Sequence, residues 1–179
     1  MNKTKLVNCF LSGRRKSISK YENQTEELQS KVLQKLIRQA IHTEWGQTHG
    51  FAQVNDYNSF TKTSPINTYE ELKGYIDRMR RGEKDVLWSG KVRWYAKSSG
   101  TTNDKSKFIP VSKECLQDTH YRGGTDAVAL YLGQNPRSRM FDGKALILGG
   151  SHSPNYNLPH SLVGDLSAIL IENVSPFVN

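Results

Sequence analysis

Cysteines and long apolar runs are both scarce in this sequence. Its 179 residues include two cysteines, and no apolar stretch approaches the roughly 20 residues that a membrane-spanning helix needs. Cys9 and Cys115 lie far apart, so a disulfide scaffold and a cysteine metal cluster are excluded, and we expect two thiols. The short apolar run at residues 6–11 is interrupted by Asn8 and lacks a small-residue cleavage pattern, which excludes a secretory signal. These absences favour a cytoplasmic protein.

Acidic residues are missing from the first 20 positions. Lysines and arginines there account for six of the eight net positive charges, whereas residues 21–179 carry 19 basic and 17 acidic side chains. A nucleic-acid-binding face needs basic side chains gathered on the folded body. We therefore expect a basic N-terminal arm at residues 1–20 and no nucleic-acid partner.

The remaining chain, residues 21–179, is long enough to bury one sizeable core. Its strongly apolar segment 166–171 is followed almost at once by the C-terminal residue, without a polar tail. We expect a partial domain that is truncated at its C-terminal end. Apolar surface should then be exposed where the missing part packs.

Three helices are predicted from apolar spacing and capping residues. Thr25 caps the first, whose apolar positions repeat at a period of 3.6 as far as Ile41. Thr68 and Glu71 form a capping box for the second, which ends before Gly82. The polar stretch at residues 55–64 between these two helices is expected to be a loop.

The third helix is capped by Ser112 and runs to about Leu132. At helical spacing, one stripe of this helix faces inward; its members are Leu116, His120, Gly123, Ala127 and Leu130.

Strands are predicted at residues 92–97, 108–111 and 144–148, the last of them buried. The resulting fold class is α/β: N-terminal helices followed by a mixed sheet with flanking helices.

The segment between the first two strands, residues 98–107, reads Ser-Ser-Gly-Thr-Thr-Asn-Asp-Lys-Ser-Lys. Gly100 allows the backbone to approach a ligand closely, so that successive amides can form an anion-binding concavity. Hydroxyl groups add hydrogen-bond donors, and a lysine adds positive charge; these residues are Ser98, Ser99, Thr101, Thr102, Lys105 and Lys107. A polyphosphate suits such a loop, although a solvated turn without a ligand has the same composition. The spacing excludes a Walker loop and a dinucleotide fingerprint.

The same loop carries a resemblance to a known family. Residues 96–102 (Ala-Lys-Ser-Ser-Gly-Thr-Thr) and 107–111 (Lys-Phe-Ile-Pro-Val) resemble the first nucleotide motif of the auxin-responsive (Gretchen Hagen) acyl-acid amido synthetases, which are adenylate-forming enzymes. The resemblance spans nearly the whole chain and extends to residues 43–46, 65–72, 82–88 and 141–144. It implies part of an adenylate-forming N-terminal domain.

The resemblance also implies an activity, ATP-dependent ligation. A carboxylic acid attacks the α-phosphate of ATP, pyrophosphate leaves, and an amino acid then takes the acyl group as an amide. The loop would hold the β- and γ-phosphates, and magnesium would accompany ATP with its protein ligand outside this chain. Asp104 departs from the family pattern, so we expect it to point outward or to act through the magnesium ion.

The resemblance implies, too, that this chain is an N-terminal fragment with little turnover alone, because the later nucleotide motifs are missing from it. The missing C-terminal part of the same protein would then be a partner, together with the carboxylic acid and the amino acid. The alternative is a non-catalytic binding or interaction module with the same fold.

Two residues of the helix after the loop are weaker candidates for the substrate. Related enzymes place substrate contacts on this helix, which suggests Arg122 for an acyl carboxylate and His120 beside it. His120 is equally explained as a core residue, and Arg122 as part of a surface ion network with Asp118 and Asp126. No catalytic side chain and no metal site are assigned.

Overall fold

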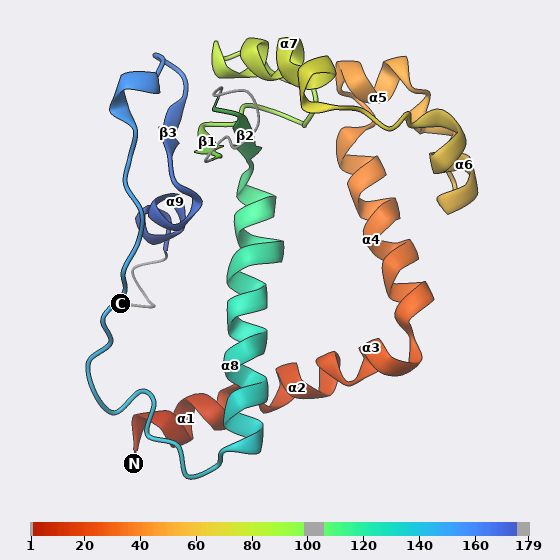
Figure 1. Cartoon of the computed structure of the whole chain (residues 1–179). Coiled ribbons are helices and arrows are strands. Elements are labelled where there is room, and N and C mark those ends of the chain that lie inside the picture. Colours follow the sequence, from red (N-terminus) through yellow and green to blue (C-terminus); the bar gives the residue numbers. More distant parts are fainter. Residues whose placement is uncertain (1, 99–105, 175–179) are drawn as a thin grey trace. The chain divides into compact units, whose positions relative to one another are not determined.

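The computed structural model describes residues 2–98 and 106–174 (Figure 1). The chain divides into two compact units. The helical unit comprises Met1–Leu28 and Glu114–Leu148, and the sheet unit comprises Gln29–Lys113 and Gly149–Asn179. Across the described ranges, no helix combines the length and the apolar character that crossing a membrane requires.

The helical unit is built around α8 (Arg122–Gln134), which continues a π-helical segment, η2 (Cys115–Tyr121). Against α8 pack the first two helices, α1 (Lys3–Phe10) and α2 (Ser12–Ile18), and a short α3 (Lys20–Asn23) follows them. The buried core of this unit is small and consists of Leu11, Ala129 and Leu132.

Residues 1–20 are described from Asn2 onward, and most of them are helical. The Asn2 side chain caps α1, and Arg14 of α2 forms a bidentate ion pair with Asp126 of α8, at 2.5 and 2.6 Å. This basic segment therefore uses one of its charges inside the unit, where a basic arm was expected from the charge distribution. The domain boundary after residue 20 stays a prediction.

The predicted inward stripe of the third helix is correct at Leu116, which is buried, but wrong from Gly123 onward. Gly123, Ala127 and Leu130 are exposed, and Ala129 and Leu132 are buried instead. The π-helical segment explains the difference, because each of its turns contains more residues than an α-helical turn and so changes which side chains share a face. Apolar spacing that assumes a uniform period of 3.6 misses this rotation.

The first helical layer of the sheet unit begins with α4 (Thr25–Ala40). The first residues of α4 belong to the helical unit, and the helix belongs to the sheet unit from Gln29 onward. It leads to α5 (Glu44–Thr48), the 3₁₀ turn η1 (Phe51–Gln53) and α6 (Tyr57–Thr63). The core of this layer is formed by Ile37, Ala40, Phe51 and Val54.

Two local predictions for this layer need correction. Residues 57–63 are helical rather than a loop, because Asp56 and Ser59 form a capping box that starts α6 in a polar sequence. The start of α4 at Thr25 is confirmed, but the Thr25 hydroxyl donates to the Tyr21 carbonyl.

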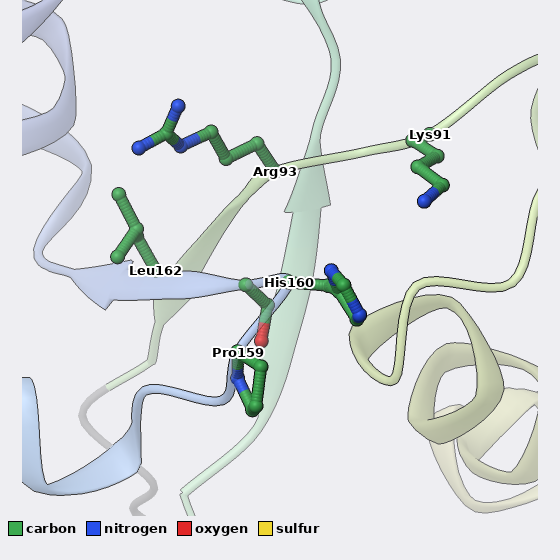
Figure 2. Close-up of a pocket in the computed structure, with 6 residues that line it drawn as sticks. Lys91, Arg93, Pro159, His160 and Leu162 are labelled. Atoms are coloured by element: carbon green, nitrogen blue, oxygen red, sulfur yellow. The ribbon is translucent and has the colours of Figure 1, made fainter.

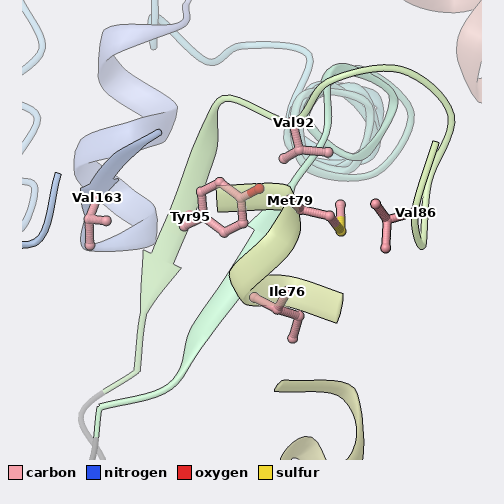
Figure 3. Packing of buried hydrophobic residues seen from close by; sticks show 6 residues of the cluster. All are labelled: Ile76, Met79, Val86, Val92, Tyr95 and Val163. Carbon is pink, nitrogen blue, oxygen red and sulfur yellow. The ribbon is translucent and has the colours of Figure 1, made fainter. Parts of the chain in front are cut away.

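The predicted second helix is confirmed as α7 (Tyr69–Arg80), with the capping box of Thr68 and Glu71. Its buried apolar side chains, Ile76 and Met79, pack over a three-stranded mixed sheet (Figure 3). The other buried members of this core are Val86, Val92, Tyr95 and Val163.

The sheet has the order β2-β1-β3. β1 (Trp94–Lys97) pairs antiparallel with β2 (Phe108–Val111), in a register that places Lys97 opposite Phe108. β3 (Leu162–Gly164) pairs parallel with β1. Along the chain, β3 comes after the 3₁₀ turn η3 (Pro154–Tyr156) and before α9 (Leu166–Glu172). Helices with a small mixed sheet confirm the α/β class.

The predicted buried strand at residues 144–148 is wrong. This segment has no regular secondary structure, and Leu146, Ile147 and Leu148 are 86%, 70% and 85% exposed. The sheet partner that joins β1 is β3, a three-residue strand too short to stand out in the sequence. An apolar run becomes a buried strand only where another strand accepts its backbone hydrogen bonds.

Candidate functional site

The predicted phosphate loop connects β1 to β2 in the sheet unit. Five of its candidate residues lie outside the described residues, namely Ser99, Gly100, Thr101, Thr102 and Lys105, and so does Asp104. The structure describes the two ends of the loop, Ser98 and Lys107. The site is therefore built from those ends and from the side chains around them.

Backbone and side-chain hydrogen bonds close the base of the loop. The Ser98 amide donates to the Lys107 carbonyl at 3.0 Å, and the Lys107 amide donates to Ser98 Oγ at 3.3 Å. Both amides at the loop ends are thus used by the protein itself. The Ser98 hydroxyl keeps its own proton for donation, because here its oxygen acts as the acceptor.

Tyr69 supports the Lys107 end of the loop from the first turn of α7. Its hydroxyl oxygen accepts a hydrogen bond from the Phe108 amide at 2.9 Å, and Lys107 Nζ lies 5.5 Å from the centre of its ring. An ammonium within about 6 Å of an aromatic ring is attracted to the face of the ring. Tyr69 belongs to the family-like run at residues 65–72, but no local signal in the sequence indicates that it reaches the loop.

Tyr156 of η3 supports the opposite end. Lys97 Nζ lies 4.4 Å from the centre of the Tyr156 ring, and that ring lies 5.7 Å from the ring of Phe108. Lys97 directly precedes the loop, and Tyr156 comes from a segment far along the chain. This contact was not predicted, because the Ser/Pro/Asn-rich segment around Tyr156 gives no sign of approaching β1.

A third cation, Arg80, lies over Phe108. Its guanidinium carbon is 3.8 Å from the ring centre, and Nη2 donates to the Tyr156 carbonyl at 2.6 Å. Arg80 is only 9% exposed, and its Nε has no hydrogen-bond partner within the described part of the chain. The neighbouring arginine of the same helical turn, Arg78, binds Glu44 and Glu83 instead.

These contacts define a group of residues that we call the loop base. Its members are the cations Arg80, Lys97 and Lys107 and the aromatic residues Tyr69, Phe108 and Tyr156. None of the three cations has a carboxylate partner among the residues that the structure describes, whereas Arg78 has two. The loop base thus presents three cations that are not paired with carboxylates, and such an arrangement suits a polyphosphate ligand.

Burial raises the pKa of one further side chain near the loop base. Tyr95 of β1 is fully buried, which raises the pKa of its hydroxyl, and the charge of Arg80 opposes that effect. The Tyr95 hydroxyl has no hydrogen-bond partner among the described residues. Tyr95 is therefore neutral at any physiological pH and serves the core rather than proton transfer.

The weaker candidates, His120 and Arg122, belong to the helical unit. Arg122 Nη2 lies 3.3 Å from Asp118, four residues earlier, while Asp126 is paired with Arg14. His120 is half-buried in η2. A surface ion pair accounts for Arg122 in this chain, and a substrate role for either residue stays a prediction.

Comparison with known proteins finds similar sequences and a similar solved structure. The GH3 family N-terminal domain matches residues 14–174. Jasmonoyl--L-amino acid synthetase JAR4 of Nicotiana attenuata is 34% identical over 94 residues, which is 52% of this chain and 16% of that protein. Indole-3-acetic acid-amido synthetase GH3.15 of Arabidopsis thaliana is 32% identical over 93 residues, 51% of this chain and 16% of that protein.

A solved GH3.15 acyl acid amido synthetase has the same fold, with a TM-score of 0.70 and 24% sequence identity. The match covers 88% of this chain and 28% of that structure. The chain spans less than a fifth of the length of the curated relatives named above.

Proposed function

Since the chain belongs to the GH3 family, we propose that it supplies the phosphate-holding loop of an ATP-dependent acyl-acid amido synthetase. The proposal covers Ser98, Ser99, Gly100, Thr101, Thr102, Lys105 and Lys107 as the residues that bind ATP. Residues 21–179 would be part of the domain that carries this loop. The relatives' names, which include jasmonoyl- and indole-3-acetic acid-amido synthetases, support the reaction class.

The loop base is the observation that supports this proposal most directly. Lys97 and Lys107 flank the loop on both sides, and each is held on an aromatic ring rather than paired with an acid. A ring attracts an ammonium without neutralising it, so both charges remain available to an anion. Arg80 adds a third charge whose Nε has no partner in the described residues.

The chemistry assigned to these residues is charge stabilisation and positioning. A carboxylate oxygen attacks the α-phosphorus of ATP, the bond to the bridging oxygen breaks, and pyrophosphate leaves with the electron pair. Donors aimed at the β- and γ-phosphates stabilise that leaving charge, which is the main protein contribution to such a step. An amino acid nitrogen then forms the amide bond, AMP leaves, and the amine proton passes to solvent.

The other ligands follow from the same reaction class. The substrates would be a small carboxylic acid and an amino acid, with His120 and Arg122 as weak candidates for contact. Magnesium would accompany ATP, with a protein ligand outside this chain. The C-terminal part of a longer protein would complete the site, and a cytoplasmic location fits two thiols.

The first experiment measures tripolyphosphate binding to this chain by calorimetry. Tripolyphosphate tests the loop without needing an adenine pocket. We expect saturable binding that Gly100→Val weakens about tenfold, the loss of roughly one charge-assisted hydrogen bond. The control is Gly143→Val, because Gly143 is exposed and an added Cβ there meets no atom within 4 Å.

Equal binding by Gly100→Val and Gly143→Val would contradict the phosphate-loop assignment. It would favour the alternative, a non-catalytic binding or interaction module with the same fold. A pyrophosphate-exchange assay on the same chain addresses turnover separately, and we expect little exchange without further nucleotide motifs.

A further inference from the structure

A second cationic site lies at the other end of β1 from the phosphate loop. A cavity of about 380 Å³ opens there, entirely within the sheet unit (Figure 2). It is lined by Lys91, Arg93, Pro159, His160, Ser161 and Leu162. None of the lining side chains is acidic.

The two cations of this cavity point to solvent because Val92, between them, is buried in the core. In an extended segment successive side chains alternate in direction, so the neighbours of a buried residue face outward. Lys91 and Arg93 are both exposed, and neither has an ion-pair partner among the residues described. In Figure 2 the Arg93 side chain extends to the left and Lys91 lies at the right, with Pro159 and His160 below them.

The floor of the cavity is a fixed turn. Leu158 and Ser161 exchange two backbone hydrogen bonds, at 3.0 and 3.1 Å, which close the turn that carries Pro159 and His160. The His160 ring lies against Gly82, where an added Cβ would come within 2.7 Å of two ring carbons. Gly82 therefore makes room for the ring at this position.

Ser161 supplies an unused polar group in the same cavity. It is only 1% exposed, and its Oγ has no hydrogen-bond partner among the described residues. A buried hydroxyl without a partner is unfavourable, so such groups are usually satisfied by a ligand, water or protein atom. Its presence beside two unpaired cations indicates a place where an acceptor is missing.

We propose that this cavity binds a small organic molecule with two anionic groups, each a carboxylate or a phosphate. The two groups would meet Lys91 and Arg93 at the two sides, and Ser161 and His160 would donate between them. The volume is within the range of pockets for small ligands, roughly 300 to 1,000 Å³. This site is separate from the phosphate loop and does not depend on the proposed ligase activity.

The test is a calorimetric titration of this chain with succinate, glutarate and phosphoglycolate. Acetate and inorganic phosphate serve as single-group probes at the same ionic strength. We expect the two-group probes to bind at least about tenfold more tightly, because each group adds a charge-assisted contact. The comparison of glutarate with phosphoglycolate shows which anion the cavity prefers.

Variants locate the binding. Lys91→Ala and Arg93→Ala should each weaken the best probe about tenfold, whereas Lys84→Ala, an exposed lysine outside the cavity, should leave it unchanged. Ser161→Ala should weaken binding without lowering the unfolding temperature of the unliganded chain, because it removes an unpartnered hydroxyl.

Gly100→Val separates the cavity from the phosphate loop, and we expect it to leave dicarboxylate binding unchanged. Equal affinity for single- and two-group probes would overturn the proposal. So would equal losses in Lys84→Ala and Lys91→Ala, since that result indicates non-specific attraction to a basic surface.

Discussion

The hydroxyl oxygen of Tyr69 accepts a hydrogen bond from the backbone amide of Phe108 at 2.9 Å. This bond joins the first turn of α7 to the first residue of β2, directly after the predicted phosphate loop. The ring of the same tyrosine lies beneath the ammonium group of Lys107. One side chain thus fixes both the backbone and the charge at this end of the loop.

Tyr69→Phe should destabilise the chain by about 1 kcal/mol, because the Phe108 amide loses its partner while the ring remains. Urea unfolding followed by circular dichroism measures this change. Tyr57→Phe is the matched control, since Tyr57 is exposed and its hydroxyl makes no hydrogen bond within the described residues. Equal stability of the two variants would show that the Tyr69 hydroxyl does not hold the loop.

The stability of the chain should fall in acid, partly because the carboxylates that pair with Arg78 become protonated. Hydrogen bonds and charge attraction from Arg78 hold the pKa values of Glu44 and Glu83 below the ordinary value of 4.5. A carboxylate with a lowered folded-state pKa stabilises the protein above its unfolded-state pKa, and this contribution disappears as pH falls through the folded-state value. All three side chains are partly exposed, so salt should reduce the effect.

Thermal unfolding between about pH 5 and about pH 2 tests this expectation. Arg78→Met should show a smaller loss of melting temperature over that range than the unsubstituted chain. Lys84→Met removes the same charge from an exposed lysine outside this cluster and should keep the full loss. A parallel pH dependence in Arg78→Met and the unsubstituted chain would count against the assignment.

Gly82→Ala and Gly74→Ala should change stability in opposite directions. Gly82 has a φ of +97°, and an added Cβ would meet the His160 ring at 2.7 Å. We expect a loss of about 1 to 3 kcal/mol from backbone strain. Gly74 is exposed inside α7 with open space around it, so alanine there should stabilise by roughly 0.5 to 1 kcal/mol. Chemical denaturation of both variants decides between these signs.

Leu132→Ala and Leu148→Ala test the burial assigned to the two segments of the helical unit. Leu132 of α8 is fully buried in the core of the helical unit, whereas Leu148 is 85% exposed. Loss of a buried leucine side chain costs about 2 to 5 kcal/mol, and loss of the exposed one should stay within about 0.5 kcal/mol. A comparable loss of stability in both variants would contradict the exposure of Leu148 and support the buried strand predicted at residues 144–148.

Much of the local structure could be predicted because its signals lie within a few residues. The capping box of Thr68 and Glu71 starts α7 through bonds that span three residues. The two apolar runs on either side of the predicted phosphate loop were predicted as strands, and they pair as the β1–β2 hairpin. This pairing also depends on segments that are close in the sequence. The same loop motif also carried the family resemblance, which the GH3 match confirms.

The failures have equally specific causes. Apolar spacing placed Leu130 inward, but the π-helical turn upstream turned Leu132 inward instead. The apolar composition of residues 144–148 led to the prediction of a strand, but none of the described strands pairs with this segment. The polar residues of α6 led to the prediction of a loop, because the segment lacks an apolar stripe and the capping residue Asp56 was given less weight.

Neighbouring residues in the sequence were enough to predict the starts of α4 and α7, the hairpin around residues 98–107 and membership of the GH3 family, because each depends on contacts within a short segment. Three features could be seen only in the folded chain: β3 pairs with β1, Tyr69 and Tyr156 contact the lysines at the two ends of the loop, and the His160 ring packs against Gly82. These contacts join residues far apart in the chain, and their energy is gained only after the intervening segments have been ordered.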